Sequence, residues 1–148
     1  RPPAGGGTRP ATPVGAMTRV PPTILLADDD DVFRKLLARA LESSGYRVRQ
    51  VSNGADAIEA LARAADVEGE MPDLVVLDAC MPELSGLGIL AVMRRFPRRP
   101  PTFMVTGFAH GSVDVVATLR GANRVFHKPI ELDELLAAIR AALPTSSQ

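Results

Sequence analysis

The chain has 148 residues, 46% of them hydrophobic and 23% charged, and its 17 basic and 17 acidic side chains give a formal net charge of zero. The even charge argues against direct nucleic-acid binding, which usually needs a basic excess, and no apolar run approaches the ~18 residues of a membrane span. The single cysteine, Cys80, excludes an internal disulfide and fits a reducing compartment, so we expect a cytoplasmic protein with no membrane contact.

The first 22 residues form a compositionally distinct segment. They contain six prolines, four glycines and no acid, which predicts a disordered linker because so few apolar side chains cannot offset the entropy of ordering. Since the chain begins with Arg1 and not with methionine, we interpret it as a fragment or a processed product.

Short apolar runs then alternate with segments of helical periodicity. We predict strands at residues 23–27, 46–51, 74–77, 102–105 and 124–127. Helices are predicted from Asp30 to a stop at Gly45, and at 54–65, 87–96, 112–120 and 131–143. Five such units predict an α/β fold, a parallel sheet with helices on both faces. We assign residues 23–143 to one domain and residues 144–148 to a C-terminal tail.

Polar side chains stand where four of the five predicted strands end. Asp28 and Asp29 follow the first strand, Asp78 the third, Thr106 the fourth and Lys128 the fifth. Ligands of parallel α/β sheets collect outside the carboxyl ends of the strands. These five residues therefore predict one functional site.

The chemistry of this set points to phosphoryl transfer. Clustered carboxylates raise one another's pKa unless a cation lies among them, and a hard divalent cation such as Mg²⁺ or Mn²⁺ prefers oxygen ligands. Lys128, one of only two lysines, offers a compact positive charge to a phosphoryl oxygen, and Thr106 offers a hydroxyl donor. One carboxylate can then act as the nucleophile and form an aspartyl phosphate.

Four motifs carry a family resemblance. The segments "ADD" (27–29), "LDACMPELSG" (77–86), "VTG" (105–107) and "HKP" (127–129) resemble the receiver domain of two-component response regulators, over about residues 23–143. The resemblance implies a flavodoxin-like, doubly wound (βα)5 sandwich with parallel strand order 2-1-3-4-5.

The resemblance also implies roles for single residues. Asp78 becomes the phosphoacceptor, and Thr106 and Lys128 contact the phosphoryl group. Asp28, Asp29, Asp78 and the backbone carbonyl of Cys80 become the ligands of Mg²⁺ or Mn²⁺, with Asp29 preferred to Asp28 as the direct ligand.

The implied partner is a histidine kinase or a histidine phosphotransfer protein, whose phosphohistidine supplies the phosphoryl group in a phosphorelay. The receiver is then a phosphoacceptor and not a conventional enzyme, and phosphorylation shifts its population toward a rearranged surface. A transient homodimer is left open. We slightly favour a fragment of a hybrid sensor histidine kinase over a single-domain response regulator.

Three positions depart from the family pattern. Val125 stands where many members have an aromatic switch residue, and Phe126, one residue later, should face the opposite side of the sheet. Ser85 replaces an acid that is common before the motif's glycine. The Cys80 side chain occupies a position that lines the mouth of the site.

Two other functions are considered. Asp28 and Asp30 match the opening motif of aspartate-nucleophile phosphohydrolases of the haloacid dehalogenase type, but no late acidic pair follows Lys128. A receiver-like binding module that never carries phosphate is the other alternative, and the intact acidic set argues against it.

Several residues receive structural readings. Asp30 and Asp31 are expected to cap the helix that follows them, and His110 and His127 to be solvated or packed. The four arginines in "RRFPRRP" (94–100) are expected to be a solvated helix end, with recognition of an acidic partner as the alternative.

Overall fold

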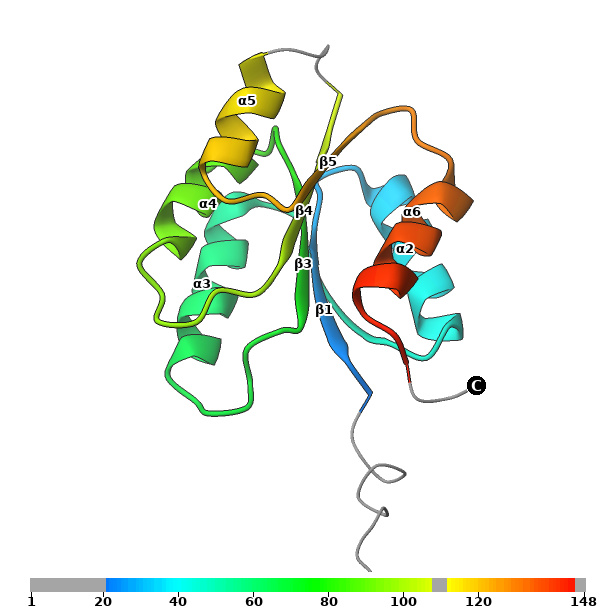
Figure 1. Ribbon diagram of the computed structural model, residues 1–148, viewed down its shortest axis with the longest axis horizontal. Helices are drawn as coiled ribbons and strands as arrows, with labels where there is room; N and C mark the ends of the chain where they lie inside the picture. The colour runs from blue at the N-terminus through cyan, green and yellow to red at the C-terminus, as the bar shows by residue number, and fades with distance from the viewer. Residues whose placement is uncertain (1–20, 108–111, 146–148) are drawn as a thin grey trace, which may run out of the picture.

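The computed structural model describes residues 21–107 and 112–145 (Figure 1). The predicted linker, apart from Pro21 and Pro22, lies outside the described residues, and so do His110 and the last three residues of the predicted tail. None of the helices in the described ranges combines the length and the apolar character that a membrane crossing requires.

Five strands and five helices alternate along the chain. The strands are β1 (Thr23–Ala27), β2 (Arg47–Val51), β3 (Leu74–Asp78), β4 (Thr102–Thr106) and β5 (Arg124–His127). The helices are α2 (Asp31–Ser43), α3 (Gly54–Ala65), α4 (Gly86–Met93), α5 (Ser112–Leu119) and α6 (Leu132–Ala142). All strand pairs are parallel and the sheet order is β2-β1-β3-β4-β5, which confirms the predicted fold class and topology.

The sheet separates two apolar cores. Helices α3, α4 and α5 cover one face and α2 and α6 cover the other, on the left and right of Figure 1. Strand β1 supplies both cores by alternation, since Leu25 packs toward α3 and α4 whereas Ile24 and Leu26 pack toward α2 and α6. Every residue of β3 and β4 is buried, which explains why these strands read as continuous apolar runs.

Helix α4 is shorter than predicted. It ends at Met93, and the next residues form tighter turns in which the amides of Arg95 and Phe96 donate to the carbonyls of Val92 and Met93, each at 3.0 Å. Pro97 disfavours a helical backbone at the residue before it. The apolar spacing that continues to Phe96 therefore reflects packing of Phe96 against the core, and the helix itself does not extend that far.

Two capped helices position the loops at the carboxyl edge of the sheet. The Asp30 carboxylate accepts a 3.1 Å hydrogen bond from the Phe33 amide and caps α2, as predicted. Ser85 caps α4 by accepting from the Gly88 amide at 3.2 Å. Ser85 thus performs the capping task that a carboxylate can also perform at this position.

Candidate functional site

Three carboxylates converge at the carboxyl edge of the sheet. Asp28 and Asp78 are buried, with 1% and 5% of their surfaces exposed, whereas Asp29 is exposed. One oxygen from each carboxylate lies within 4.8 Å of the others. The predicted acidic cluster is therefore present as a geometric unit.

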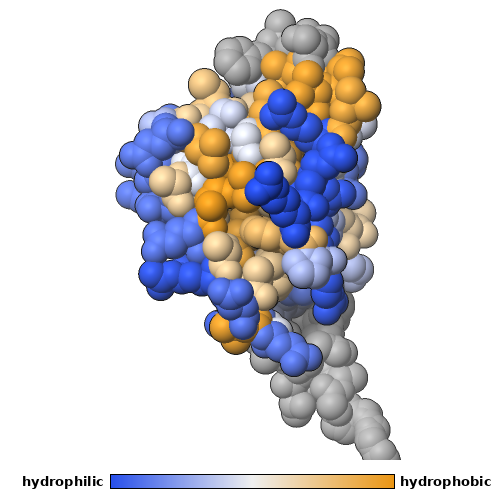
Figure 2. Space-filling view, turned by 90° about the vertical axis from the view of Figure 1, so that its left-hand side faces the viewer, coloured by the Kyte–Doolittle hydropathy of each residue, from blue (hydrophilic) through white to orange (hydrophobic). Residues whose placement is uncertain are grey.

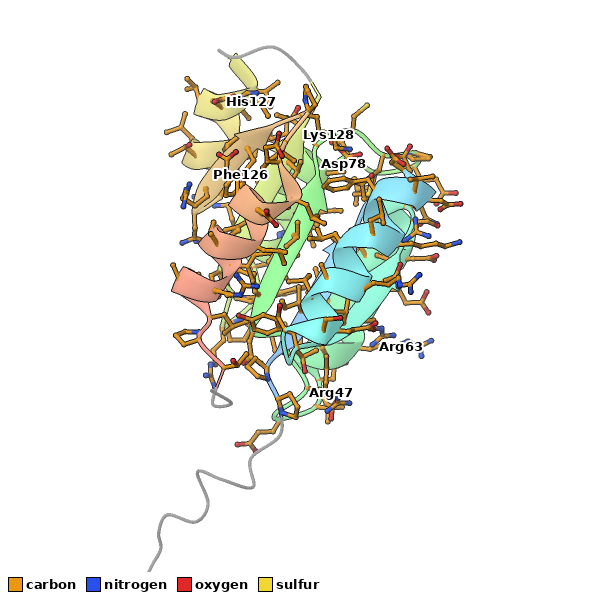
Figure 3. All side chains as sticks on the ribbon, turned by 90° about the vertical axis from the view of Figure 1, so that its right-hand side faces the viewer. Arg47, Arg63, Asp78, Phe126, His127 and Lys128 are labelled. Carbon is orange, nitrogen blue, oxygen red and sulfur yellow. The ribbon has the colours of Figure 1, made fainter. Side chains whose placement is uncertain are left out.

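Lys128 reaches the same cluster from the end of β5. Its ammonium nitrogen lies 3.1 Å from Oδ2 of Asp28 and 3.8 Å from Oδ2 of Asp78. Figure 3 shows Lys128 and Asp78 next to each other at the upper end of the sheet. The same nitrogen lies 5.0 Å from the centre of the Phe33 ring, which fits a cation–π contact. Two carboxylates and one aromatic ring thus hold the lysine over the site.

Asp78 is the carboxyl group of the cluster whose pKa is clearly shifted. Burial, followed by the negative charge of Asp28, raises the pKa of the Asp78 carboxyl from 3.8 to about 7, whereas the charge of Lys128 lowers it. A side-chain hydrogen bond to Asp29 also raises this pKa, and the backbone N–H of Cys80, at 3.3 Å from Oδ1, lowers it. One lysine therefore does not compensate the two buried acids.

Thr106 and Cys80 complete the predicted set. Thr106 is fully buried at the end of β4, one residue past Val105, which is aligned with Asp78 across the two strands. The amide of Lys128 donates to the carbonyl of Thr106 at 2.7 Å and so joins β5 to β4 next to the site. Cys80 is exposed directly after β3. The structure brings all five strand-end residues to one edge.

Arg34 is a buried residue of this region that the sequence did not predict. It is 8% exposed, and one guanidinium nitrogen donates to the backbone carbonyl of Asp28 at 2.8 Å and lies 2.8 Å from Asp31. Its Nε donates to the side chain of Gln50 at 3.1 Å. Arg34 thereby ties the acidic loop to α2 and β2. Its helical position alone gave no signal of burial.

The side chains of β5 show where Val125, which replaces the family's aromatic switch residue, and the neighbouring Phe126 lie. Val125 packs against the core under α3, α4 and α5, whereas Phe126 is buried in the opposite core and lies 5.4 Å from the ring of Phe103. This confirms the predicted opposite facing. Of the two environments expected for His127, solvated or packed, the structure shows the packed one, and its Nε2 lies 2.8 Å from a carboxylate oxygen of Asp114 on α5.

Comparison with known proteins agrees with this geometry. The family described as "Response regulator receiver domain" matches residues 24–140. Response regulator MprA of Mycobacterium leprae is 38% identical over 120 residues, which are 81% of this chain and 50% of MprA. Regulatory protein AtoC of Escherichia coli is 34% identical over 84% of this chain and 26% of its own length. The chain thus spans half or less of these two relatives.

Two solved structures extend the comparison to three dimensions. A receiver domain protein of Methanospirillum hungatei is 25% identical with a TM-score of 0.72, covering 82% of this chain and 92% of the other. A Burkholderia pseudomallei response regulator, solved with a phosphorylated aspartic acid, a calcium ion and citrate, is 30% identical with a TM-score of 0.67, covering 79% and 65%. Motifs, strand-end geometry and both comparisons lead to one conclusion: this chain belongs to the response regulator receiver domain family.

Proposed function

We propose that Asp78 accepts a phosphoryl group from a phosphohistidine of a histidine kinase or a histidine phosphotransfer protein, and that residues 23–143 form the phosphoacceptor unit. The observation that carries this assignment is a buried carboxylate at the end of β3 with a pKa raised to about 7 and an ammonium group 3.8 Å away. Perturbed carboxyl groups of this kind are typical of functional sites.

The transfer follows from the positions of the charges. A carboxylate oxygen of Asp78 attacks phosphorus while the bond between phosphorus and the imidazole nitrogen breaks, and the leaving nitrogen keeps the electron pair. The Lys128 ammonium, within 4 Å of both buried carboxylates, neutralises charge on the transferring group. Positioning and charge stabilisation supply most of the catalysis in such transfers.

A divalent cation fits the acidic side of the site. Asp28 and Asp78 bring two buried charges against a single lysine, and Asp29 is exposed where an ion can reach it. Asp29, Asp78 and the Cys80 carbonyl would hold Mg²⁺ or Mn²⁺ directly, and Asp28 would support it while bound to Lys128. When bound, the cation supplies positive charge beside the phosphoryl oxygens. The calcium ion of the Burkholderia protein supports this reading.

Thr106 and Lys128 would bind the new phosphoryl oxygens. The phosphoryl group replaces one carboxylate charge with about two negative charges. Both residues lie where β4 and β5 end, and the Lys128 amide already bonds the Thr106 carbonyl. A shift of Thr106 would therefore also move the end of β5. This movement would bias a pre-existing equilibrium between two conformations of the α5 surface.

Phosphorylation by a small donor tests this function. The chain is incubated with acetyl phosphate and Mg²⁺, and the intact mass is measured by mass spectrometry. We expect the mass of one added phosphoryl group, its loss on chelation of Mg²⁺ before the reaction, and its loss in Asp78→Asn. Equal uptake by Asp78→Asn, or none by the native chain, would contradict the assignment.

Family membership favours this function over the haloacid dehalogenase alternative, and the intact acidic set favours it over a phosphate-free binding module. The larger protein stays a prediction. A hybrid histidine kinase was slightly favoured by the sequence, whereas the curated relatives named above are regulators. The encoded sequence upstream of Arg1 distinguishes the two, because a hybrid kinase would show a histidine-bearing helical pair and an ATP-binding domain there.

A further inference from the structure

Three arginines converge in a hollow far from the acidic site in the fold. The hollow has a volume of about 410 Å³ and is lined by Arg94, Arg99 and Arg120, with Phe96 and Leu119 among its apolar walls. It lies where α4 and α5 end, whereas the acidic cluster lies where the strands end. We call it the arginine hollow. In Figure 2, which shows the face covered by α3, α4 and α5, deep-blue side chains lie beside an orange area.

No acid neutralises these arginines in the part of the chain that the structure describes. The ion pairs there are those of Arg34, Arg63, His127 and Lys128, and no carboxylate lines the hollow. Arg63, on the same side of the sheet, is different because it forms an ion pair with Glu59 at 2.7 Å. The positive charges of the hollow are therefore not paired within the described fold.

Backbone contacts hold the guanidinium groups in place. One nitrogen of Arg120 donates to the Leu87 carbonyl at 3.0 Å, and one of Arg94 lies 3.5 Å from the Leu119 carbonyl. Each guanidinium carries five N–H donors, so most of them stay available for a ligand. Held side chains lose less entropy on binding.

The Arg99 guanidinium lies against Gly121. Gly121 has φ of +107°, and a Cβ added to it would lie only 2.9 Å from a guanidinium nitrogen of Arg99. The guanidinium thus lies against bare backbone where any other residue would displace it. Gly121 thus leaves room for Arg99 in the hollow that Arg94 and Arg120 also line.

Helix dipoles do not balance this charge. Helices α4 and α5 both end at the hollow, and each C-terminus is equivalent to roughly −0.5 charge, or about −1 together. Three guanidinium groups leave a surplus of about +2 after that. Arg95 and Arg98, both exposed nearby in sequence, add to the field. A ligand with about two negative charges matches the surplus.

We propose that the arginine hollow binds a small phosphorylated ligand, a phosphate monoester carried on an organic group. Guanidinium forks match phosphate oxygens in bidentate geometry. Phe96 and Leu119 offer apolar contact to the organic part, and the volume fits the range of about 300–1,000 Å³ that small-molecule sites occupy. The charges converge on one hollow and are not spread along a stripe, which favours a compact anion over an extended polyanion. The site shares no lining residue with the acidic cluster.

Binding of adenosine monophosphate and of inorganic phosphate, each titrated into ¹⁵N-labelled protein, tests this site. The titrations are done in EDTA, so that no metal draws phosphate to the acidic cluster. We expect saturable shifts of the amide signals of residues 119–121, with tighter binding of the nucleotide than of phosphate. Arg99→Gln and Arg120→Gln should each weaken binding about tenfold, which is about 1.4 kcal/mol, because each removes a charge-assisted hydrogen bond to the phosphate.

Arg39→Gln is the matched control, because Arg39 is an exposed residue of α2 on the opposite face and should leave binding unchanged. Arg99→Gln also keeps the test valid if Arg120→Gln does not fold, since Arg99 is exposed. The inference is overturned by absence of saturation, by equal loss in Arg39→Gln, or by phosphate binding as tightly as the nucleotide. Tighter binding of hexaglutamate or of duplex DNA than of the nucleotide at equal salt would also overturn it.

Discussion

The Nζ atom of Lys128 lies 3.1 Å from Oδ2 of Asp28, a residue 100 positions earlier in the chain. Asp28 is 1% exposed, so this ion pair is largely shielded from solvent. Asp28 is the closer of the two carboxylates that orient the lysine, since the contact of the ammonium with Asp78 is longer, at 3.8 Å. The lysine is therefore held in place before a phosphoryl group arrives.

We expect Lys128→Met to slow phosphorylation of Asp78 by at least about tenfold, because one lost charge contact in a desolvated site costs more than 1.4 kcal/mol. The rate is measured by intact mass with acetyl phosphate and Mg²⁺. Lys35→Met is the matched control, since Lys35 is the other lysine and is exposed on α2. Similar rates in both variants would contradict the role of Lys128.

Asp78→Asn should stabilise the fold at pH 8 in the absence of divalent cations. The folded-state pKa of about 7 lies above the ordinary value of 3.8, so between these values the folded protein keeps a proton that the unfolded chain has lost. The free energy of unfolding therefore falls as pH rises through this window. The substitution should add about 4 kcal/mol at pH 8 and less than about 1 kcal/mol at pH 4.

Urea unfolding of both proteins at the two pH values measures this difference. Asp66→Asn is the control, because Asp66 is an exposed residue at the end of α3. A gain at pH 8 that persists unchanged at pH 4 would show that the charge of Asp78 is not the cause.

Gly86→Ala should destabilise the fold by about 3 kcal/mol, as overpacking of a closed backbone contact does. A Cβ on Gly86 would lie 2.3 Å from the backbone carbonyl oxygen of Asp78. The loop after β3 would have to move away from the phosphoacceptor, so phosphorylation should slow as well. Gly107→Ala is the control for stability, since a Cβ there meets no atom of the described residues within 4 Å. Equal unfolding midpoints for the two variants would refute the steric reading.

Asp114→Ala should loosen α5 against β5. The contact between Asp114 and His127 is partly buried, and loss of one such hydrogen bond costs about 1 kcal/mol. Hydrogen exchange followed by mass spectrometry should show faster exchange in α5 and unchanged exchange in α3. Asp133→Ala, an exposed acid in the first turn of α6, serves as the control. Unaltered exchange in α5 would mean that this pair does not fasten the helix.

Local patterns predicted the strands and the residues at their ends, whereas the sheet order was implied by the family resemblance. Apolar runs mark buried strands, and their last residues necessarily meet at one edge of a parallel sheet. Asp28, Asp78, Thr106 and Lys128 could therefore be placed together before any coordinates. The family motifs then indicated which role each of these residues has, which the apolar periodicity alone does not reveal.

The rest depends on contacts between distant segments. Arg34 reads as one more polar helix residue until the loop before it folds over its guanidinium. The Lys128–Phe33 contact joins the end of β5 to α2, and no local pattern encodes such a pair. The arginines of 94–100 were expected to be a solvated helix end, and only the structure shows that Arg94 and Arg99 meet Arg120 across two helices.

Strand β2 lies at the border of the sheet, and one side of its backbone has no neighbouring strand in the described fold. Such a border can recruit strands from other molecules and seed aggregates. Arg47 and Arg49 are both exposed along it, and in a parallel, in-register stack of copies these guanidinium groups would face their own counterparts. Like-charge repulsion at this border therefore protects concentrated protein against fibre growth.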